Sequence, residues 1–137
     1  MATKVLDSWA LIAFFEDEPA AEAVEKLLEQ ATAERHKLLI SVVNWGEVYY
    51  NTMREVSEAA AEQKLGEIAA MPIEVVGADL PLTKQAAIYK ATKKMSYADC
   101  FGAALAKIKN AEFVTGDPEF KEVEKEIKIN WLTSNAR

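Results

Sequence analysis

The chain has 137 residues, of which 50% are hydrophobic and 28% are charged, with 5 Gly and 4 Pro. This length and composition predict one globular domain over residues 1–137 and exclude a disordered or fibrous chain. The net charge of -6 argues against a protein that holds nucleic acid through a broadly basic surface. The single cysteine, Cys100, excludes an intramolecular disulfide.

The sequence contains no run of about 18 consecutive apolar residues, the length that a membrane-spanning helix needs. The N-terminal residues MATKVLDSWALIAFFEDEP also lack the small-residue cleavage site of a secretory signal. We therefore expect a soluble, cytoplasmic protein that does not interact with a membrane.

Short apolar segments alternate with longer segments of helical spacing along the chain. A strand is expected at 4–7, a helix from Ser8, a helix from Pro19 through Glu34, a strand at 38–43, a helix from Asn44 to about Ala70 with an interruption near Ser57, a strand at 73–76, a helix from Thr83 through Lys94, a helix from Ser96 through Lys109, a strand at 112–115, a short helix from Asp117-Pro118 to about Ile127, and a strand at 127–132. Helical connections of this kind join parallel strands. The predicted fold class is α/β, a three-layer α/β/α sandwich with a mainly parallel five-stranded sheet.

Four acidic residues fall close to the ends of the predicted strands. Asp7 closes the first strand, and Glu47 lies in the first helical turn after the second. Asp99 lies in the first turn of the helix that begins at Ser96, and Asp117 follows the fourth strand. Because ligands bind outside the carboxyl ends of strands in an open parallel sheet, we expect these four carboxylates to meet at one edge.

Each acid also has a purely structural explanation. Glu47 comes three residues after Asn44, and Asp99 comes three residues after Ser96, which is the spacing of a capping box. Asp7 and Asp117 stand where they could cap the helices that follow them. Capping does not explain why all four gather at the same edge, and that joint placement favours a metal site.

Clustered carboxylates repel one another unless a cation compensates, and Mg²⁺ prefers oxygen ligands. One histidine and one cysteine do not suit a softer metal. We expect His36 at a surface helix end and Cys100 buried in a helix. Glycine-rich phosphate loops and the G-x-S-x-G motif are absent from the sequence. What remains is a metal-only site, which suits hydrolysis of phosphodiesters.

Four motifs in order resemble the PIN domain family: LDS at 6–8, the glutamate of NWGEVYY, YAD at 97–99 and TGDPEF at 115–120. The resemblance runs from Lys4 to Leu132 and is strongest to VapC-type toxins of type II toxin–antitoxin modules. It implies a ribonuclease that depends on Mg²⁺ or Mn²⁺ and hydrolyses RNA phosphodiester bonds.

The resemblance also implies roles for individual residues. Asp7, Glu47, Asp99 and Asp117 match the family's catalytic and metal-binding acids, with Asp7 and Asp99 expected to contact the metal directly. Ser8 and Thr115 match the hydroxyl positions beside the first and last acids.

Two residues near the expected site depart from the family pattern. Trp9 stands where smaller residues are usual, and Asn44 stands where threonine or serine is common. Both departures bear on how the substrate fits more than on metal binding.

The stretch between Asp79 and Asp99 has no acidic residue. We interpret the lysines in this stretch as one solvated face of a helix. The alternative is a patch in which Lys90, Lys93 and Lys94 contact RNA phosphates. Core packing is likewise the expected role of three aromatic residues near Glu47, and a protein contact surface is the alternative. These residues are Trp45, Tyr49 and Tyr50.

The resemblance further implies a homodimer and a small antitoxin partner whose basic tail suits the negative charge of this chain. Three other functions stay open from the sequence. They are an RNA-maturation nuclease without a toxin role, an inactive PIN-like binding module, and a metal-dependent phosphatase that acts on small molecules.

Overall fold

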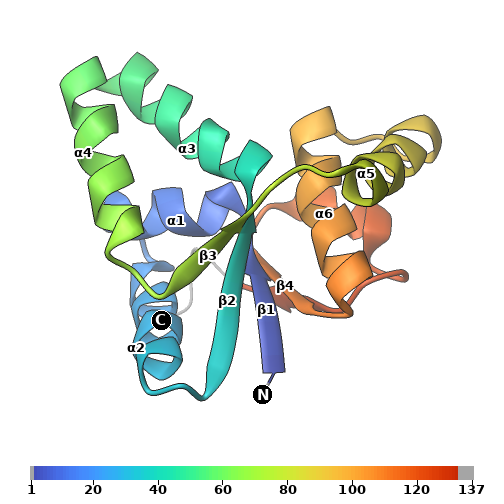
Figure 1. The fold of residues 1–137 in the computed structure, drawn as a ribbon, viewed down its shortest axis with the longest axis horizontal. Helices are drawn as coiled ribbons and strands as arrows, with labels where there is room; N and C mark the ends of the chain where they lie inside the picture. The colour runs from blue at the N-terminus through green and yellow to red at the C-terminus, as the bar shows by residue number, and fades with distance from the viewer. Residues whose placement is uncertain (1, 133–137) are drawn as a thin grey trace.

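A computed structural model describes residues 2–132 and confirms the predicted α/β sandwich. Five strands form one wholly parallel sheet in the order β3-β2-β1-β4-β5, and helices cover both of its faces (Figure 1). The strands are β1 (Ala2–Leu6), β2 (His36–Ser41), β3 (Ile73–Val76), β4 (Glu112–Thr115) and β5 (Ile129–Trp131). The helices are α1 (Ser8–Phe15), α2 (Ala21–Thr32), α3 (Val42–Glu55), α4 (Glu58–Ala69), α5 (Leu80–Thr92), α6 (Tyr97–Lys109) and the 3₁₀ helix η1 (Pro118–Val123).

The sheet divides the core into two apolar clusters. Successive side chains of a strand point to opposite faces. Val5 and Leu39 therefore pack with α5, α6 and η1, whereas Leu6 and Ile40 pack with α1 and α2. The central strands are covered on both sides, which explains why the three consecutive residues Leu38, Leu39 and Ile40 of β2 are all apolar and buried.

The strand order places a topological switch point beside β1. The chain adds β2 and β3 on one side of β1, and then crosses over to add β4 and β5 on the other. Connections that leave neighbouring strands in opposite directions open a crevice at their carboxyl ends, where α/β proteins bind ligands. Asp7 lies at this point, since it follows β1 and its N–H donates to the Val114 carbonyl of β4 at 3.0 Å.

Strand β2 ends two residues earlier than the sequence predicts. Ser41 is the N-cap of α3, and its side chain accepts a hydrogen bond from the backbone N–H of Asn44. Val42 and Val43 therefore lie in the first helical turn, and the prediction of Asn44 as the cap was wrong. An apolar run suits a strand or a buried helix equally well, and here the serine hydroxyl decides between them.

Helix α2 begins at Ala21 rather than at Pro19, and η1 ends at Val123 rather than near Ile127. The predictions for His36 and for the start of α5 were also wrong, whereas the prediction for Cys100 was confirmed. His36 is the first residue of β2 and only 5% exposed, and its Nε2 lies 3.0 Å from the Leu27 carbonyl oxygen, a partner for the buried ring. Helix α5 begins at Leu80 with Asp79 as its cap, rather than at Thr83. Cys100 is fully buried in α6, as expected.

Gly116, between β4 and η1, is a point of close approach. A Cβ atom there would collide with the indole ring of Trp9 and would lie 2.5 Å from the carbonyl oxygen of Leu132. Trp9, the unusually large residue after Ser8, therefore fits because residue 116 has no side chain. The close approach lies between Thr115 and Asp117, two residues of the predicted site.

We expect Gly116→Ala to lower the free energy of unfolding by about 1–3 kcal/mol, the usual effect of overpacking. The backbone carbonyl of Leu132 cannot move aside as a flexible side chain would. Gly77→Ala is the matched control, because nothing lies within 4 Å of a Cβ at that position. Urea denaturation should show a change below about 0.5 kcal/mol for the control. Equal effects of the two substitutions would contradict the close approach at Gly116.

Candidate metal centre

Three of the four predicted acids come together at the switch point. Asp7, Glu47 and Asp99 each offer a carboxylate oxygen, and these oxygens all lie within 4.8 Å of one another. Asp7 follows β1, Glu47 lies in the second turn of α3, and Asp99 lies in the first turn of α6. Three segments that are remote in sequence thus supply one cluster of negative charge.

Asp7 is the most buried member, with 1% of its surface exposed. Its Oδ2 accepts a hydrogen bond from the Thr115 hydroxyl at 2.7 Å. Its Oδ1 is buried and has no hydrogen-bond partner among residues 2–132. Burial raises the pKa of Asp7 well above its usual value; the Thr115 hydrogen bond opposes this, and the negative charges of Asp99 and Glu47 add to it.

Asp99 is 8% exposed, and its backbone N–H donates to the Ser96 hydroxyl that caps α6. Burial raises the pKa of Asp99 from 3.8 to about 6, and the charges of Glu47 and Asp117 add to this effect. The cluster therefore gathers carboxyl groups in a poorly solvated site, where burial and the neighbouring acids oppose the ionisation of Asp7 and Asp99.

A divalent cation fits this arrangement. The unpartnered Oδ1 of Asp7 is a buried acceptor, and no lysine or arginine in the described part of the chain forms an ion pair with the three clustered acids. The donor set consists of carboxylate oxygens, which suit hard cations such as Mg²⁺ and Mn²⁺. The third carboxylate is held in place, because Glu47 Oε1 accepts hydrogen bonds from Ser8 Oγ at 2.9 Å and from Asn44 Nδ2 at 2.8 Å.

Asp117 lies at the edge of the cluster and caps η1. Its Oδ1 accepts a hydrogen bond from the Glu119 N–H at 2.9 Å, and its own N–H donates to the Thr115 hydroxyl. Asp117 also groups with Asp99 and Glu119, whose carboxylate oxygens lie within 4.8 Å of one another. Glu119 was missed by the sequence analysis. The only signal was its place two residues after Asp117, from which the tight 3₁₀ turn brings it toward Asp99.

The two predicted hydroxyl residues both contact the acids, although on different partners. Thr115 donates to Asp7, whereas Ser8 donates to Glu47 rather than to its neighbour Asp7. The site therefore has a hydrogen-bond donor for each of two carboxylates.

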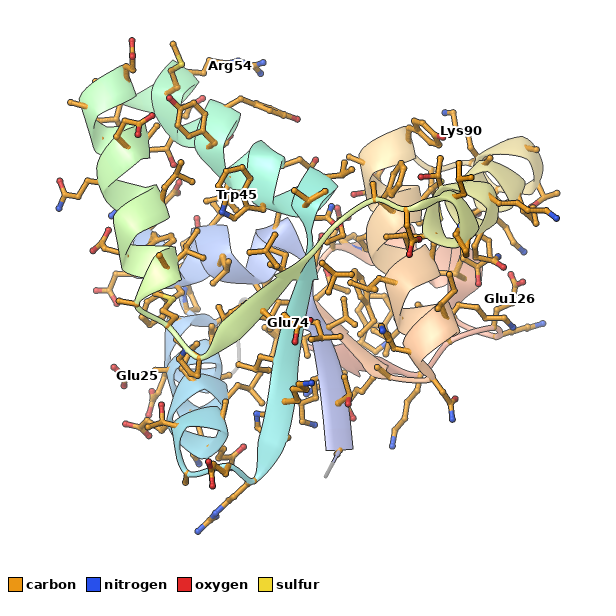
Figure 2. All side chains as sticks on the ribbon, viewed as in Figure 1. Glu25, Trp45, Arg54, Glu74, Lys90 and Glu126 are labelled. Atoms are coloured by element: carbon orange, nitrogen blue, oxygen red, sulfur yellow. The ribbon has the colours of Figure 1, made fainter. Side chains whose placement is uncertain are left out.

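Two of the three candidate RNA-binding lysines contact other parts of the protein. Lys93 Nζ lies 2.7 Å from Glu126 Oε2, and Lys90 Nζ donates to the Met95 carbonyl at 3.0 Å. Lys90 lies on the α5 side of the molecule (Figure 2), and Lys94 is exposed. Their contact with RNA phosphates stays a prediction.

The aromatic residues of α3 divide between core and surface. Trp45 packs against the apolar cluster on the α1 and α2 face of the sheet. Tyr50 is 48% exposed, with the Arg54 guanidinium 5.1 Å from its ring centre, and Figure 2 shows Arg54 at the far end of α3. Core packing is therefore confirmed for Trp45 but not for Tyr50.

Comparison with protein-family models matches the PIN domain over residues 4–126, which is well over half of the chain. The chain belongs to the PIN domain family. A comparison with curated proteins found no match. None of the helices within residues 2–132 has the length and apolar character to span a membrane.

Solved structures with the same fold include toxin–antitoxin complexes. VapBC2 from Rickettsia felis, bound to a promoter DNA fragment, has a TM-score of 0.73 and 16% identity, over 93% of this chain and 97% of that one. DNA-bound VapBC from Salmonella typhimurium has a TM-score of 0.71 and 17% identity, over 95% and 98%. VapC20 from Mycobacterium tuberculosis, described as a Sarcin-Ricin loop cleaving toxin, has a TM-score of 0.69 and 15% identity, over 86% and 92%. At these identities the similarity establishes the fold.

We expect the metal-free PIN domain to lose stability as the pH rises from about 4 through 6 and above. An acid whose pKa is raised by folding binds more protons in the folded state than in the unfolded state, so raising the pH favours unfolding. The raised pKa values of Asp7 and Asp99 set this window. Thermal unfolding in EDTA at pH 5, 6 and 7.5 measures the effect.

Asp7→Asn removes the buried charge with little change of shape and should reduce this pH dependence. At pH 7.5 in EDTA, the variant should be more stable than the natural chain by about 1–3 kcal/mol, because it removes a buried charge that Asp99 and Glu47 repel. A variant that is less stable than the natural chain under these conditions would show that the Asp7 charge is already compensated within the protein.

Proposed function

We propose that this PIN domain is an endoribonuclease that depends on Mg²⁺ or Mn²⁺ and acts as the toxin of a type II toxin–antitoxin pair. The observation that carries the proposal is the buried carboxylate of Asp7, whose Oδ1 has no partner among residues 2–132 and which lies beside Glu47 and Asp99. A site that gathers negative charge at the ligand-binding edge of the sheet suits a cation and the phosphate group that it would neutralise.

In the proposed site, Asp7 and Asp99 would hold the cation directly, and Glu47 would complete the group. When bound, the cation supplies Lewis-acid chemistry that makes water a better nucleophile and offsets charge on the phosphate. Asp117 is half-buried and lies outside the Asp7 group, so it would be the carboxylate that orients the attacking water and accepts its proton. Thr115 and Ser8 keep Asp7 and Glu47 in position through their hydrogen bonds.

The comparisons support RNA as the substrate. VapC20 is a toxin that cleaves the Sarcin-Ricin loop, and this chain shares its fold. The four predicted acids are all present, which weighs against the inactive binding module. An RNA-maturation nuclease and a small-molecule phosphatase differ from the proposal in their substrates, so activity assays separate them.

RNA cleavage by metal-stripped protein is expected only after Mg²⁺ or Mn²⁺ is added. Asp7→Asn and Asp99→Asn each remove one ligand charge and should lower the cleavage rate at least about 100-fold, as the loss of several kcal/mol of electrostatic stabilisation implies. Asp79→Asn is the matched control, because Asp79 caps α5 away from the cluster and asparagine caps equally well. Cleavage of a chromogenic phosphomonoester with RNA left intact would favour the phosphatase instead.

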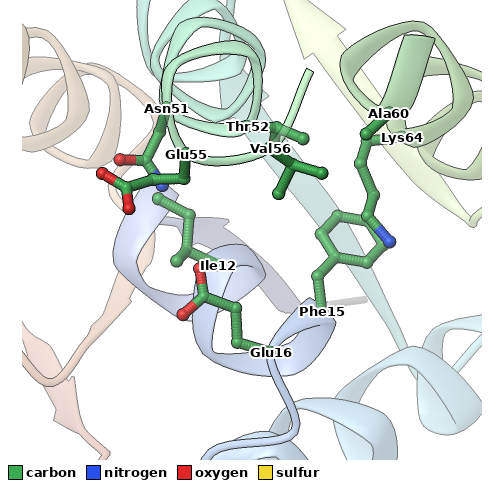
Figure 3. A pocket seen from close by; sticks show the side chains of 9 residues that line it. All are labelled: Ile12, Phe15, Glu16, Asn51, Thr52, Glu55, Val56, Ala60 and Lys64. Atoms are coloured by element: carbon green, nitrogen blue, oxygen red, sulfur yellow. The ribbon is translucent and has the colours of Figure 1, made fainter. Parts of the chain in front are cut away.

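A groove between α1, α3 and α4 is the surface proposed for the antitoxin (Figure 3). Its volume is about 260 Å³, and Ile12, Phe15 and Val56 give it an apolar lining. Glu16 and Glu55 lie on one side of it, as Figure 3 shows. An amphipathic partner segment with apolar and basic residues fits both features. The neighbouring structures from Rickettsia felis and Salmonella typhimurium are VapBC assemblies, which supports a protein partner for this chain.

Val56→Asp should weaken the complex with the proposed antitoxin by at least about tenfold. Val56 is 72% exposed, so the substitution should leave the fold intact while placing a charge in the groove. Ile108→Asp is the control, since Ile108 is an exposed residue of α6 outside the groove. Co-purification and titration calorimetry with both variants measure the effect, and equal binding by all three proteins would exclude the groove.

The homodimer also stays a prediction. The outer side of α5 leaves Leu80 and Ile88 85% and 47% exposed, and Tyr97 at the start of α6 is 45% exposed. A second copy of the chain would cover this apolar surface.

A further inference from the structure

Asn44 has no exposed surface, although it is polar and lies only three residues before Glu47. We propose that Asn44 is a positioning residue that fixes Glu47 relative to Asp99 in the metal centre. The inference rests on the proposed function in so far as those acids hold the cation.

The Asn44 side chain connects the elements that carry two of the acids. Its Nδ2 donates to Glu47 Oε1 at 2.8 Å and to the Ala98 carbonyl oxygen at 3.1 Å. Glu47 is on the same helix, α3, whereas Ala98 directly precedes Asp99 on α6. One amide group therefore ties the Glu47 carboxylate to the turn that carries Asp99.

The orientation of this amide is set by Ser41 at the end of β2. The Ser41 hydroxyl donates to Asn44 Oδ1 at 2.8 Å and accepts from the Asn44 N–H at 3.1 Å. If the amide were turned over, its oxygen would face two other acceptors, the Glu47 carboxylate and the Ala98 carbonyl. The NH₂ group must therefore point toward the acids.

An asparagine is suited to this place in a way that a hydroxyl residue is not. Its NH₂ group supplies two protons for Glu47 and Ala98, and its oxygen accepts from Ser41. Serine or threonine has a single proton and a shorter reach, so it could serve only one of those acceptors. The asparagine thus makes a three-way connection between β2, α3 and α6.

Gly102 allows α6 to approach this amide. A Cβ at residue 102 would lie 3.0 Å from Asn44 Oδ1 and 3.0 Å from two ring atoms of Phe113. Oδ1 is held by Ser41, and Phe113 is fully buried, so neither neighbour can easily move. The glycine and the asparagine therefore belong to one local arrangement.

The hydrogen bonds also orient the Glu47 carboxylate. The donors from Asn44 and Ser8 both contact Oε1, which leaves Oε2 for the cation. Without the Asn44 amide, the half-buried Glu47 side chain would keep the hydrogen bond from Ser8 alone and could turn toward solvent. The expected consequence is weaker cation binding rather than a lost ligand.

The test is the Mn²⁺ dissociation constant, measured by titration calorimetry at pH 7.5 on the full chain. Asn44→Asp keeps the shape but replaces the donor with a negative acceptor, and should weaken Mn²⁺ binding 10- to 100-fold, as is usual for residues that orient metal ligands. Asn44→Ser keeps a small polar side chain and should weaken Mn²⁺ binding several-fold. It serves as a second variant if the aspartate prevents folding. Asn51→Asp is the control, because it makes the same charge change further along α3. Its Mn²⁺ dissociation constant should stay within about twofold of that of the natural chain.

A double-mutant cycle with Glu47→Gln shows whether Asn44 acts through Glu47. In that background, Asn44→Ser should change Mn²⁺ affinity less than about twofold, because the group that it positions has lost its charge. A lower melting temperature with unchanged Mn²⁺ affinity would make Asn44 merely structural and overturn the inference. A natural chain that binds no Mn²⁺ would overturn it too. Mn²⁺ binding that depends on Asn44, in a protein that cleaves no RNA, would leave the inference standing and reject the nuclease.

Discussion

The buried carboxylate of Asp7 is the constraint on which the rest of the site depends. It follows the central strand of the sheet, and one of its oxygens lies in the protein interior without a partner among the described residues. Burying a charge in this way is unfavourable unless another charge compensates. The neighbouring acids increase the cost, since Glu47 and Asp99 repel Asp7. The fold therefore stores at its switch point an electrostatic strain that a divalent cation would relieve.

Hydrogen bonds from neighbouring residues fix the positions of the clustered acids. Thr115 anchors one oxygen of Asp7, and the buried amide of Asn44 joins the helix of Glu47 to the helix of Asp99. The apolar clusters on both faces of the sheet keep these helices in place. Neutralising Asp7 is expected to stabilise the metal-free protein, and the proposed metal-binding role would account for an acid at this buried position.

The fold and most of the site were predictable from the sequence, for reasons that the structure makes clear. Apolar segments with strand and helix spacing determine the order of elements, and parallel strands place Asp7, Glu47 and Asp99 at one edge. Features set by contacts between remote segments could not be predicted in this way. Glu119 reaches Asp99 through a 3₁₀ turn, and Asn44 donates to a residue 54 positions away. Patterns along the chain do not contain such distances.

A crystal structure of the protein grown with Mn²⁺ would test the metal centre most directly. Anomalous scattering locates the ion without assumptions about activity. The ion is expected between Asp7, Glu47 and Asp99, in contact with Asp7 Oδ1, the buried oxygen that has no other partner within residues 2–132. An empty cluster at saturating Mn²⁺, or an ion held only by Asp117 and Glu119, would contradict the central role given to Asp7.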